Sequence, residues 1–306
     1  MTRIDALLVL MVLIWGSNFS VIKRAFIDIP PQPFNAVRLV LSSLVFLAVI
    51  RIAREMARRG KPVSRIFYTT SPLTRRDRID LVWLGLVGHC GYQFFFVGGV
   101  ALSAASNAAL IVGATPTVLA VVSALLGRER ISGFHWVGAA LAATGIGLVV
   151  GPNVSFGGAT WKGDAMIIAS VSCWVTFTLG SARLIARHSP LYVTGMTMVY
   201  GGIPYVVLAM PQILNVRWLE VPSVSLILLV LSSLLALNLA YVIWYAGVQR
   251  LGPARTSIYS NGVPIVAMLV AWAWLGEPLT VMKIMGAAAV LSGVLITRLG
   301  RRLIGG

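Results

Sequence analysis

The chain has 306 residues, of which 58% are hydrophobic and 11% are charged, whereas soluble domains average about 45–50% and about 25%. So few charges cannot cover a water-exposed surface, which excludes an ordinary soluble domain. The formal charge of +16 would suit nucleic acid, but a mean hydropathy of +0.88 indicates a membrane protein first. Cys90 and Cys173 lie in separate apolar runs and provide neither a disulfide framework nor metal-ligand spacing.

Apolar runs follow one another almost from end to end of the chain. A helix that crosses a bilayer needs about 20 mostly apolar residues, and Pro- or Gly-containing segments at 30–33, 151–153 and 252–253 separate such runs. The first run lacks a small-residue cleavage pattern, so we expect a retained helix. The sequence therefore predicts an all-α polytopic membrane protein with ten transmembrane helices. The predicted spans cover residues 5–22, 34–53, 80–100, 103–126, 132–150, 161–182, 190–211, 223–248, 254–275 and 279–298.

The basic residues are distributed unevenly between the two sides of these spans. With a cytoplasmic N-terminus, nineteen of the 25 Lys and Arg fall on the cytoplasmic side and five on the other, while Arg38 lies inside the second span. Because cytoplasmic loops are enriched in Lys and Arg, we expect both termini in the cytoplasm of a bacterial-type inner membrane. The basic loop over residues 54–79 suits contact with anionic lipid headgroups, and we expect no nucleic-acid partner.

The chain contains an internal duplication. Residues 99–148 align with residues 247–296 without a gap, and the alignment places Pro116 on Pro264. Five spans in each half mean that the second half enters the membrane in the opposite sense, which is the inverted-repeat plan of secondary transporters. The two predicted repeats cover residues 1–152 and residues 153–306.

Several of these motifs resemble the EamA branch of the drug/metabolite transporter superfamily. They are Trp15-Gly16-Ser17-Asn18-Phe19 followed by Lys23, the repeated Pro116 and Pro264, Glu129, and Gly276-Glu277-Pro278. The resemblance implies a ten-helix carrier whose helices 1, 3, 4, 6, 8 and 9 surround a central cavity, with helices 5 and 10 outside. Many bacterial members export amino acids or other small metabolites, and aromatic amino-acid exporters are among them. The motifs are specific for the family and do not identify a substrate.

The third span carries the first candidate substrate residues. His89 is the one titratable group near the centre of a span, and helical spacing places it on one face with Tyr92, Gln93 and Phe96. A face that combines polar and aromatic surface is typical of a solute site. The alternative is that His89 and Gln93 only form hydrogen bonds to neighbouring helices.

The eighth span presents Asn238, Tyr241 and Tyr245 at spacings of three and four. These groups can donate and accept hydrogen bonds to an amino-acid carboxylate or amine. The competing interpretation is an interfacial aromatic belt, above all for Tyr245. Trp15 and Trp174 occupy related positions in the two halves. They form either apolar walls for an aromatic substrate or packing between the halves. Asn18, beside Trp15, is a further candidate for the substrate site.

Pro116 and Pro264 fall inside the fourth and ninth spans, where proline kinks a helix. We interpret the pair as matched bends that let the halves open and close, with packing kinks as the alternative. Asn107, Ser260 and Asn261 lie nearby and are further candidates for the site. Small residues on the fifth and tenth spans indicate close helix packing, within one chain or in a weak homodimer. They are Gly138, Ala142, Gly145, Gly286, Ala289 and Gly293.

All nine carboxylates fall at predicted helix ends or in loops. Because a coupled carrier commonly places a carboxylate in its pathway, this favours uniport or facilitated diffusion of a neutral or zwitterionic small molecule, without a cofactor or metal. A proton-coupled exporter of drugs is the alternative. A sugar or nucleotide-sugar carrier is also compatible with the fold, although Arg38 is the one embedded cation that a nucleotide would find. An enzyme is disfavoured because no nucleophile with a base is evident.

Overall fold

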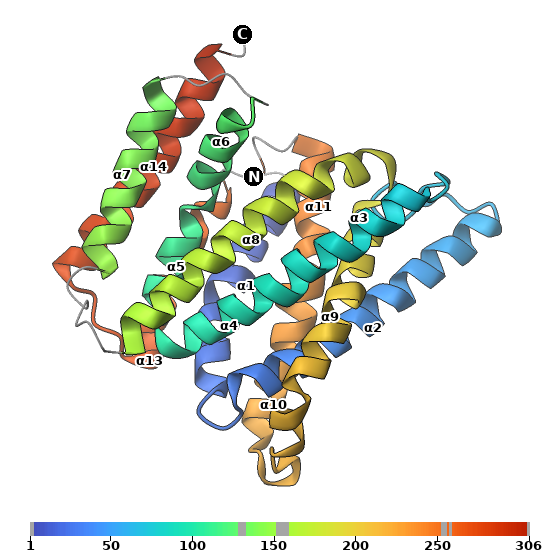
Figure 1. Ribbon diagram of the computed structural model, residues 1–306, viewed down its shortest axis with the longest axis horizontal. Coiled ribbons are helices and arrows are strands. Elements are labelled where there is room, and N and C mark those ends of the chain that lie inside the picture. Colours follow the sequence, from blue (N-terminus) through green and yellow to red (C-terminus); the bar gives the residue numbers. More distant parts are fainter. Residues whose placement is uncertain (1–2, 128–132, 151–158, 252–255, 257–258, 305–306) are drawn as a thin grey trace.

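The computed structural model describes residues 3–127, 133–150, 159–251, 256 and 259–304, which are helical almost throughout and include no strand (Figure 1). Within the described residues, each predicted span contains one helix or a run of consecutive helices. In chain order the elements are α1 (Arg3–Ala25), α2 (Pro31–Arg58), α3 (Arg75–Gly85), η1 (Leu86–Gly91), α4 (Tyr92–Leu102), α5 (Ala105–Gly113), α6 (Thr115–Leu125), α7 (Gly133–Val150), α8 (Ala159–Arg187), α9 (Pro190–Leu214), η3 (Trp218–Glu220), α10 (Ser223–Leu231), η4 (Ser232–Leu239), α11 (Ala240–Leu251), α13 (Gly262–Leu275) and α14 (Val281–Ile304).

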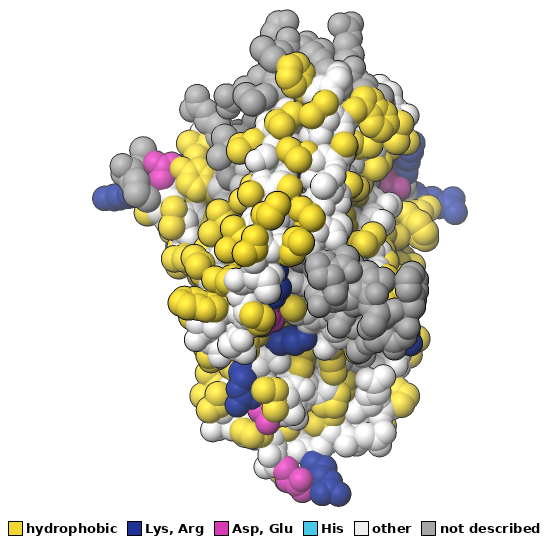
Figure 2. Space-filling model, turned by 90° about the vertical axis from the view of Figure 1, so that its left-hand side faces the viewer, with side chains coloured by type: hydrophobic (Ala, Val, Ile, Leu, Met, Phe, Trp, Pro, Cys, Tyr) yellow, Lys and Arg dark blue, Asp and Glu magenta, His cyan; other side chains and the backbone are white. Residues whose placement is uncertain are grey.

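The helical stretches have the length and polarity of membrane spans. Among the described residues, seven stretches are long and apolar enough to cross a bilayer, and Trp136–Leu148, Gly262–Leu275 and Val281–Ile296 are apolar but shorter. Hydrophobic side chains cover much of the described part of the face in Figure 2, as a surface in contact with lipid requires. The predicted all-helical class is confirmed, while the count of ten crossings stays a prediction.

Local signals at the helix ends explain where several elements begin and end. α3 begins with a capping box, in which Asp77 N–H donates to Thr74 Oγ1 at 3.1 Å and Thr74 N–H donates to the Asp77 carboxylate at 3.0 Å. Proline occupies the first turn of α2 and of α9, where the missing N–H has no helical partner. α13 ends at Gly276, whose φ of +68° favours glycine.

Helices α7 and α14 lie side by side at one edge of the molecule (Figure 1). A Cβ atom added to Gly145 would lie 2.7 Å from the carbonyl oxygen of Gly286, and one added to Gly293 would lie 2.5 Å from that of Gly138. The small residues therefore let these two backbones touch within one chain. This packing accounts for the small-residue faces without a dimer, and it places the fifth and tenth spans at the edge, as the resemblance implies.

Both repeated prolines lie at interruptions of their spans, as predicted. The helix breaks at Ala114 between α5 and α6, with Pro116 in the first turn that follows, and a turn at Asn261 precedes Pro264 in α13. A Cβ atom on Gly113 would lie 2.5 Å from Cγ of Pro264. The two interruptions therefore pack directly against each other, one from each half of the chain.

The third and eighth spans each contain a π-helix, η1 and η4, which the sequence did not predict. Tyr92 N–H bonds to the Val87 carbonyl and Ala240 N–H to the Leu235 carbonyl, each spanning five residues. Continued toward the N-terminus of each half at the same offset of 148 residues, the alignment of residues 99–148 with 247–296 would place η1 within η4. π-Helical turns are rare and occur frequently at functional sites, so the repeated pair directs attention to these two helices.

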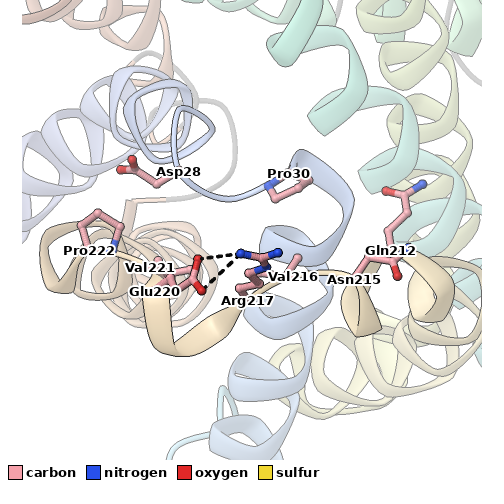
Figure 3. Close-up of a pocket in the computed structure, with 9 residues that line it drawn as sticks. All are labelled: Asp28, Pro30, Gln212, Asn215, Val216, Arg217, Glu220, Val221 and Pro222. Carbon is pink, nitrogen blue, oxygen red and sulfur yellow. Dashed lines mark hydrogen bonds and ion pairs between the residues drawn. The ribbon is translucent and has the colours of Figure 1, made fainter.

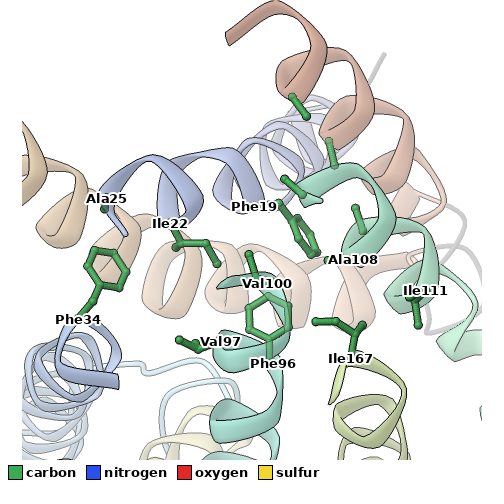
Figure 4. Close-up of a cluster of buried hydrophobic side chains, with 14 of the residues drawn as sticks. Phe19, Ile22, Ala25, Phe34, Phe96, Val97, Val100, Ala108, Ile111 and Ile167 are labelled. Carbon is green, nitrogen blue, oxygen red and sulfur yellow. The ribbon is translucent and has the colours of Figure 1, made fainter. Parts of the chain in front are cut away.

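The largest buried apolar cluster lies where α1, α2, α4, α5 and α8 converge (Figure 4). Phe19 of α1 contacts Phe96 of α4 edge to face, with ring centroids 5.6 Å apart. Val100 of α4 and Ala108 of α5 are fully buried in the same cluster. This packing joins helices from both halves of the chain and surrounds one end of the candidate site.

Candidate functional site

A continuous cluster of aromatic side chains lies where α1, η1, α4, α8 and α11 meet. Neighbouring ring centroids in it are 5.1–6.4 Å apart, within the range of favourable aromatic pairs. Both halves of the chain contribute. We call the following side chains the aromatic cluster: Trp15, Phe19, His89, Tyr92, Phe96, Trp174, Phe177, Tyr241, Trp244 and Tyr245.

Tyr241 contacts both of the tryptophans at related positions in the two halves. Its ring lies 5.8 Å from that of Trp15 and 6.4 Å from that of Trp174. The Trp15 indole N–H donates to the Ala236 carbonyl at 3.0 Å, which fixes that ring on the eighth span. The two tryptophans thus flank one phenol. They do so without a ring contact between themselves in the described structure.

The predicted face of the third span is only partly retained. Tyr92 stacks on Phe96 at 5.4 Å and contacts Trp174 at 5.1 Å, so these rings share a face as expected. His89 lies in η1, where the wider turn changes the register, and it contacts Phe177 at 5.3 Å. His89 therefore joins the cluster at its margin, between α8 and α9.

Tyr245 is 9% exposed, and its hydroxyl lies 2.7 Å from the Thr194 hydroxyl of α9. A belt residue would place its polar end at the membrane surface. The interior position of Tyr245 therefore contradicts the belt interpretation for this residue.

Several buried polar atoms around the cluster have no hydrogen-bond partner in the described part of the chain. Because buried polar atoms in proteins are almost always paired, this concentration marks a place able to bind polar groups of another molecule. Asn238 uses its amide N–H on the Ser42 carbonyl at 3.2 Å and leaves its oxygen unpaired. The unpaired atoms are Asn35 Nδ2, Arg38 Nε, both ring nitrogens of His89, Gln93 Oε1 and Asn238 Oδ1.

The other predicted residues lie outside the ring contacts that define the cluster. Asn18 accepts a hydrogen bond at 2.5 Å from the hydroxyl of Ser232, the first residue of η4. Asn107 is buried on α5 with its side-chain oxygen unpaired. Ser260 and Asn261 are half-buried at the interruption before α13. They adjoin the proline breaks, and the structure does not bring them into the cluster.

A cavity of about 570 Å³ lies elsewhere, between the α1–α2 turn and the α9–α10 connection (Figure 3). One wall carries Arg217 and Glu220, an exposed ion pair with an N–O distance of 3.4 Å. A hydrogen bond from the Ser225 hydroxyl and the Arg24 guanidinium lower the pKa of the Asp28 carboxyl. The cavity opens at an end of the molecule and contains none of the predicted substrate residues.

The described carboxylates keep to the ends of the helices, as predicted. Asp77 lies in the first turn of α3 and is paired with Arg183 at 2.9 Å and Arg187 at 3.3 Å. Glu277 follows α13 and accepts from the Ala105 N–H at 2.7 Å. Glu129 lies outside the described residues. Within those residues, no carboxylate borders the aromatic cluster.

Sequence reasoning missed four side chains of this arrangement. Phe19, Phe177 and Trp244 extend the cluster, but a single aromatic residue in an apolar span carries no signal of its own. Arg38 is 1% exposed and faces the phenols of the cluster. Its signal was present, because it is one of the few basic residues that fall inside a predicted span.

Comparisons with known proteins agree with this architecture. The sequence profile of the EamA-like transporter family matches residues 2–151 and 161–299. The uncharacterized transporter YyaM of Bacillus subtilis is 25% identical, over 92% of this chain and 88% of its own length. A protein named probable amino-acid metabolite efflux pump in Salmonella typhimurium is 25% identical, over 99% of this chain and 97% of its own length.

Two further matches cover the whole chain. A protein named probable terminal-alkyne amino-acid exporter in Streptantibioticus cattleyicolor is 25% identical over 97% of this chain and 93% of its own length. One crystal structure has a TM-score of 0.63 and covers 98% of this chain and 100% of its own, at 18% identity, which shows the fold alone. Since the family profile matches both halves, the chain has the two-repeat architecture and belongs to the EamA-like transporter family.

Proposed function

We propose that this membrane transporter exports amino acids, including aromatic ones, or related small metabolites, through a central pathway at the aromatic cluster. The observation that carries the proposal is the cluster itself, in which Trp15 and Trp174 from the two halves flank Tyr241. Aromatic walls bind the apolar part of such a solute, and the unpaired polar atoms beside them bind its charged or polar part. The names of two relatives, an amino-acid metabolite efflux pump and an amino-acid exporter, support the same substrate class.

Transport proceeds by alternating access between repeats at residues 1–152 and 153–306. The breaks before Pro116 and Pro264 free backbone groups and give each half a bend at the same position. Because the two breaks pack on each other through Gly113, a rotation of one half moves the other break with it. The aromatic cluster then faces the two sides of the membrane in turn.

The transport is uniport or facilitated diffusion in the bacterial inner membrane, with both termini cytoplasmic. A proton-coupled pathway needs a group that gains and loses a proton where the substrate binds. Within the described residues His89 is the one histidine of the aromatic cluster, and its ring packs on Phe177 at the cluster margin. The uneven distribution of Lys and Arg supports the orientation.

Purified protein in liposomes loaded with radiolabelled amino acids tests this function. We expect phenylalanine or tryptophan to leave these vesicles faster than protein-free ones. Tyr241→Ala should reduce that rate at least about tenfold, because it removes the ring that joins both tryptophans. Val40→Ala, at an exposed position of α2, is the matched control and should leave the rate unchanged.

Two results would contradict the proposal. If no amino acid leaves the vesicles faster than from protein-free ones, the substrate class is wrong. If efflux requires an imposed proton gradient and stops when an ionophore dissipates it, the uniport mechanism is wrong while the substrate class stands.

A further inference from the structure

Arg38 is a buried cation without an anionic partner in the described part of the chain. It lies in the third turn of α2 and its side chain is 1% exposed. None of the ion pairs among the described residues includes it. Its one hydrogen bond runs from Nη1 to Asn35 Oδ1 at 3.1 Å, and its Nε has no partner.

The surroundings of Arg38 are those of the aromatic cluster. The guanidinium lies near the phenols of Tyr92, Tyr205 and Tyr241, two of which belong to the cluster. The described structure leaves the Arg38 Nε and the neighbouring Asn35 Nδ2 without a hydrogen-bond partner. Donors of α2 without acceptors thus lie near the phenols of α4 and α11.

A purely structural role does not account for this arrangement. A guanidinium inside a membrane protein is costly unless an anion or several acceptors compensate it. Phe34 lies with its ring centroid 5.6 Å from the guanidinium carbon, which offers a weak cation–π contact. The Asn35 oxygen is the one hydrogen-bond acceptor that the described chain supplies. The other N–H groups of the guanidinium are therefore free to bind an acceptor of another molecule near the aromatic cluster.

We propose that Arg38 binds the carboxylate of the transported solute, so that the protein selects small carboxylates that carry an apolar or aromatic group. Arginine presents parallel N–H donors that match a carboxylate. The guanidinium is one positive charge among neutral phenols and amides, so the site suits a solute with a single negative charge. A solute held in this way places its apolar part against Trp15 and Trp174. The inference rests on the proposed function and narrows its substrate class.

Binding is measured on the purified full-length protein in detergent, by the shift of its melting temperature with ligand concentration. The probes are 3-phenylpropanoate and 3-phenylpropanamide, which have nearly the same shape and differ in the carboxylate. We expect the wild-type protein to bind the carboxylate at least about tenfold more tightly, as a charge-assisted hydrogen bond implies. Equal binding of the two probes by the wild-type protein overturns the inference without any variant.

Variants of Arg38 test whether this residue makes the difference. Arg38→Gln should weaken binding of 3-phenylpropanoate at least about tenfold and leave that of 3-phenylpropanamide within about twofold. Arg38→Lys should recover part of the preference because it keeps the charge. Lys23→Gln is the matched control, because the Lys23 ammonium binds the carbonyls of Val100 and Ala101 at the end of α1, and it should keep the full preference.

The outcomes separate this inference from the proposed function. If phenylalanine does not move in liposomes but the carboxylate preference depends on Arg38, the proposed function fails and the carboxylate site stands. If phenylalanine moves and Arg38→Gln weakens both probes equally, Arg38 has a structural role and the inference fails. A size-exclusion profile like that of the wild type is required of every variant.

Discussion

Glu277 offers the sharpest test of how the two halves are held together. Its carboxylate accepts hydrogen bonds from the backbone N–H groups of Ala105 at 2.7 Å and Ser106 at 3.2 Å, and from the Ser106 hydroxyl. A side chain from the second half thus caps the first turn of α5 in the first half. The Lys283 ammonium lies 3.6 Å from the same carboxylate, and both side chains are nearly buried.

Replacing Glu277 by Gln removes the charge and keeps the shape. A hydrogen bond to a charged group contributes about 1.5–3 kcal/mol and one between neutral groups about 0.5–1.5 kcal/mol. Lys283 also loses its anionic partner, which is costly when the pair is buried. Because these contributions are not additive, we expect the free energy of unfolding to fall by about 2–4 kcal/mol.

The assay is reversible unfolding in mixed micelles of a mild detergent and sodium dodecyl sulfate, followed by circular dichroism. The control is Glu220→Gln, the same substitution in the exposed pair with Arg217 at 3.4 Å, for which we expect a change below about 0.5 kcal/mol. Lys283→Met added to Glu277→Gln should recover part of the loss, because it removes the unpaired cation. Equal losses for the two Gln variants would refute the reasoning.

Three further predictions concern packing, motion and pH. Gly293→Leu should lower the free energy of unfolding by about 1–3 kcal/mol through overpacking. Gly147→Ala should not lower it, because no atom beyond the neighbouring helix backbone lies within 4 Å of the new Cβ. Equal effects of the two substitutions on stability would contradict the packing of α7 on α14. Pro264→Ala should reduce kcat of efflux and keep KM within about twofold, because it straightens the helix. A raised KM with unchanged kcat would contradict a role of Pro264 in the proposed motion of the two halves. Since the pKa of Asp28 is lowered in the folded state from an unfolded value of about 3.9, its contribution to stability is present at neutral pH and is lost as the pH falls through the folded value. The melting temperatures of Ser225→Ala and the wild type should therefore differ at pH 7 and converge toward pH 3.

The sequence predicts those parts of the fold that depend on local chemistry. Apolar length predicts the helices, and proline indicates the breaks before Pro116 and Pro264, because its ring lacks the N–H that a helix needs. Proline alone is not sufficient, since α9 continues through Pro204 and Pro211. Within α4, Tyr92 and Phe96 are four residues apart and stack as regular spacing requires. These features follow from the sequence of one helix and do not depend on which helix packs against it.

The sequence does not predict features that depend on the partner helix. His89 lies in η1, whose wider turn departs from the regular helical spacing on which its predicted face depends, and it packs on Phe177. Asn18 matches a polar site residue by type, but its oxygen accepts from Ser232 of η4. Whether a buried polar atom is paired depends on a residue far away in the chain, which composition and spacing do not reveal.

The described carboxylates lie near helix ends, and several of them form hydrogen bonds between the two halves of the chain. Contacts across the halves include Asp5 with the Tyr259 hydroxyl at 2.8 Å and Asp77 with Arg183 at 2.9 Å. Others join Asp28 to Ser225, Asp164 to Ser103 and Glu277 to Ser106. A charged hydrogen bond gains most where water is partly excluded. These bonds lie near helix ends, where under the proposed alternating access water replaces them as the halves separate. In the described part of the chain the acids thus lie away from the aromatic cluster, and Arg38 is the buried cation near it.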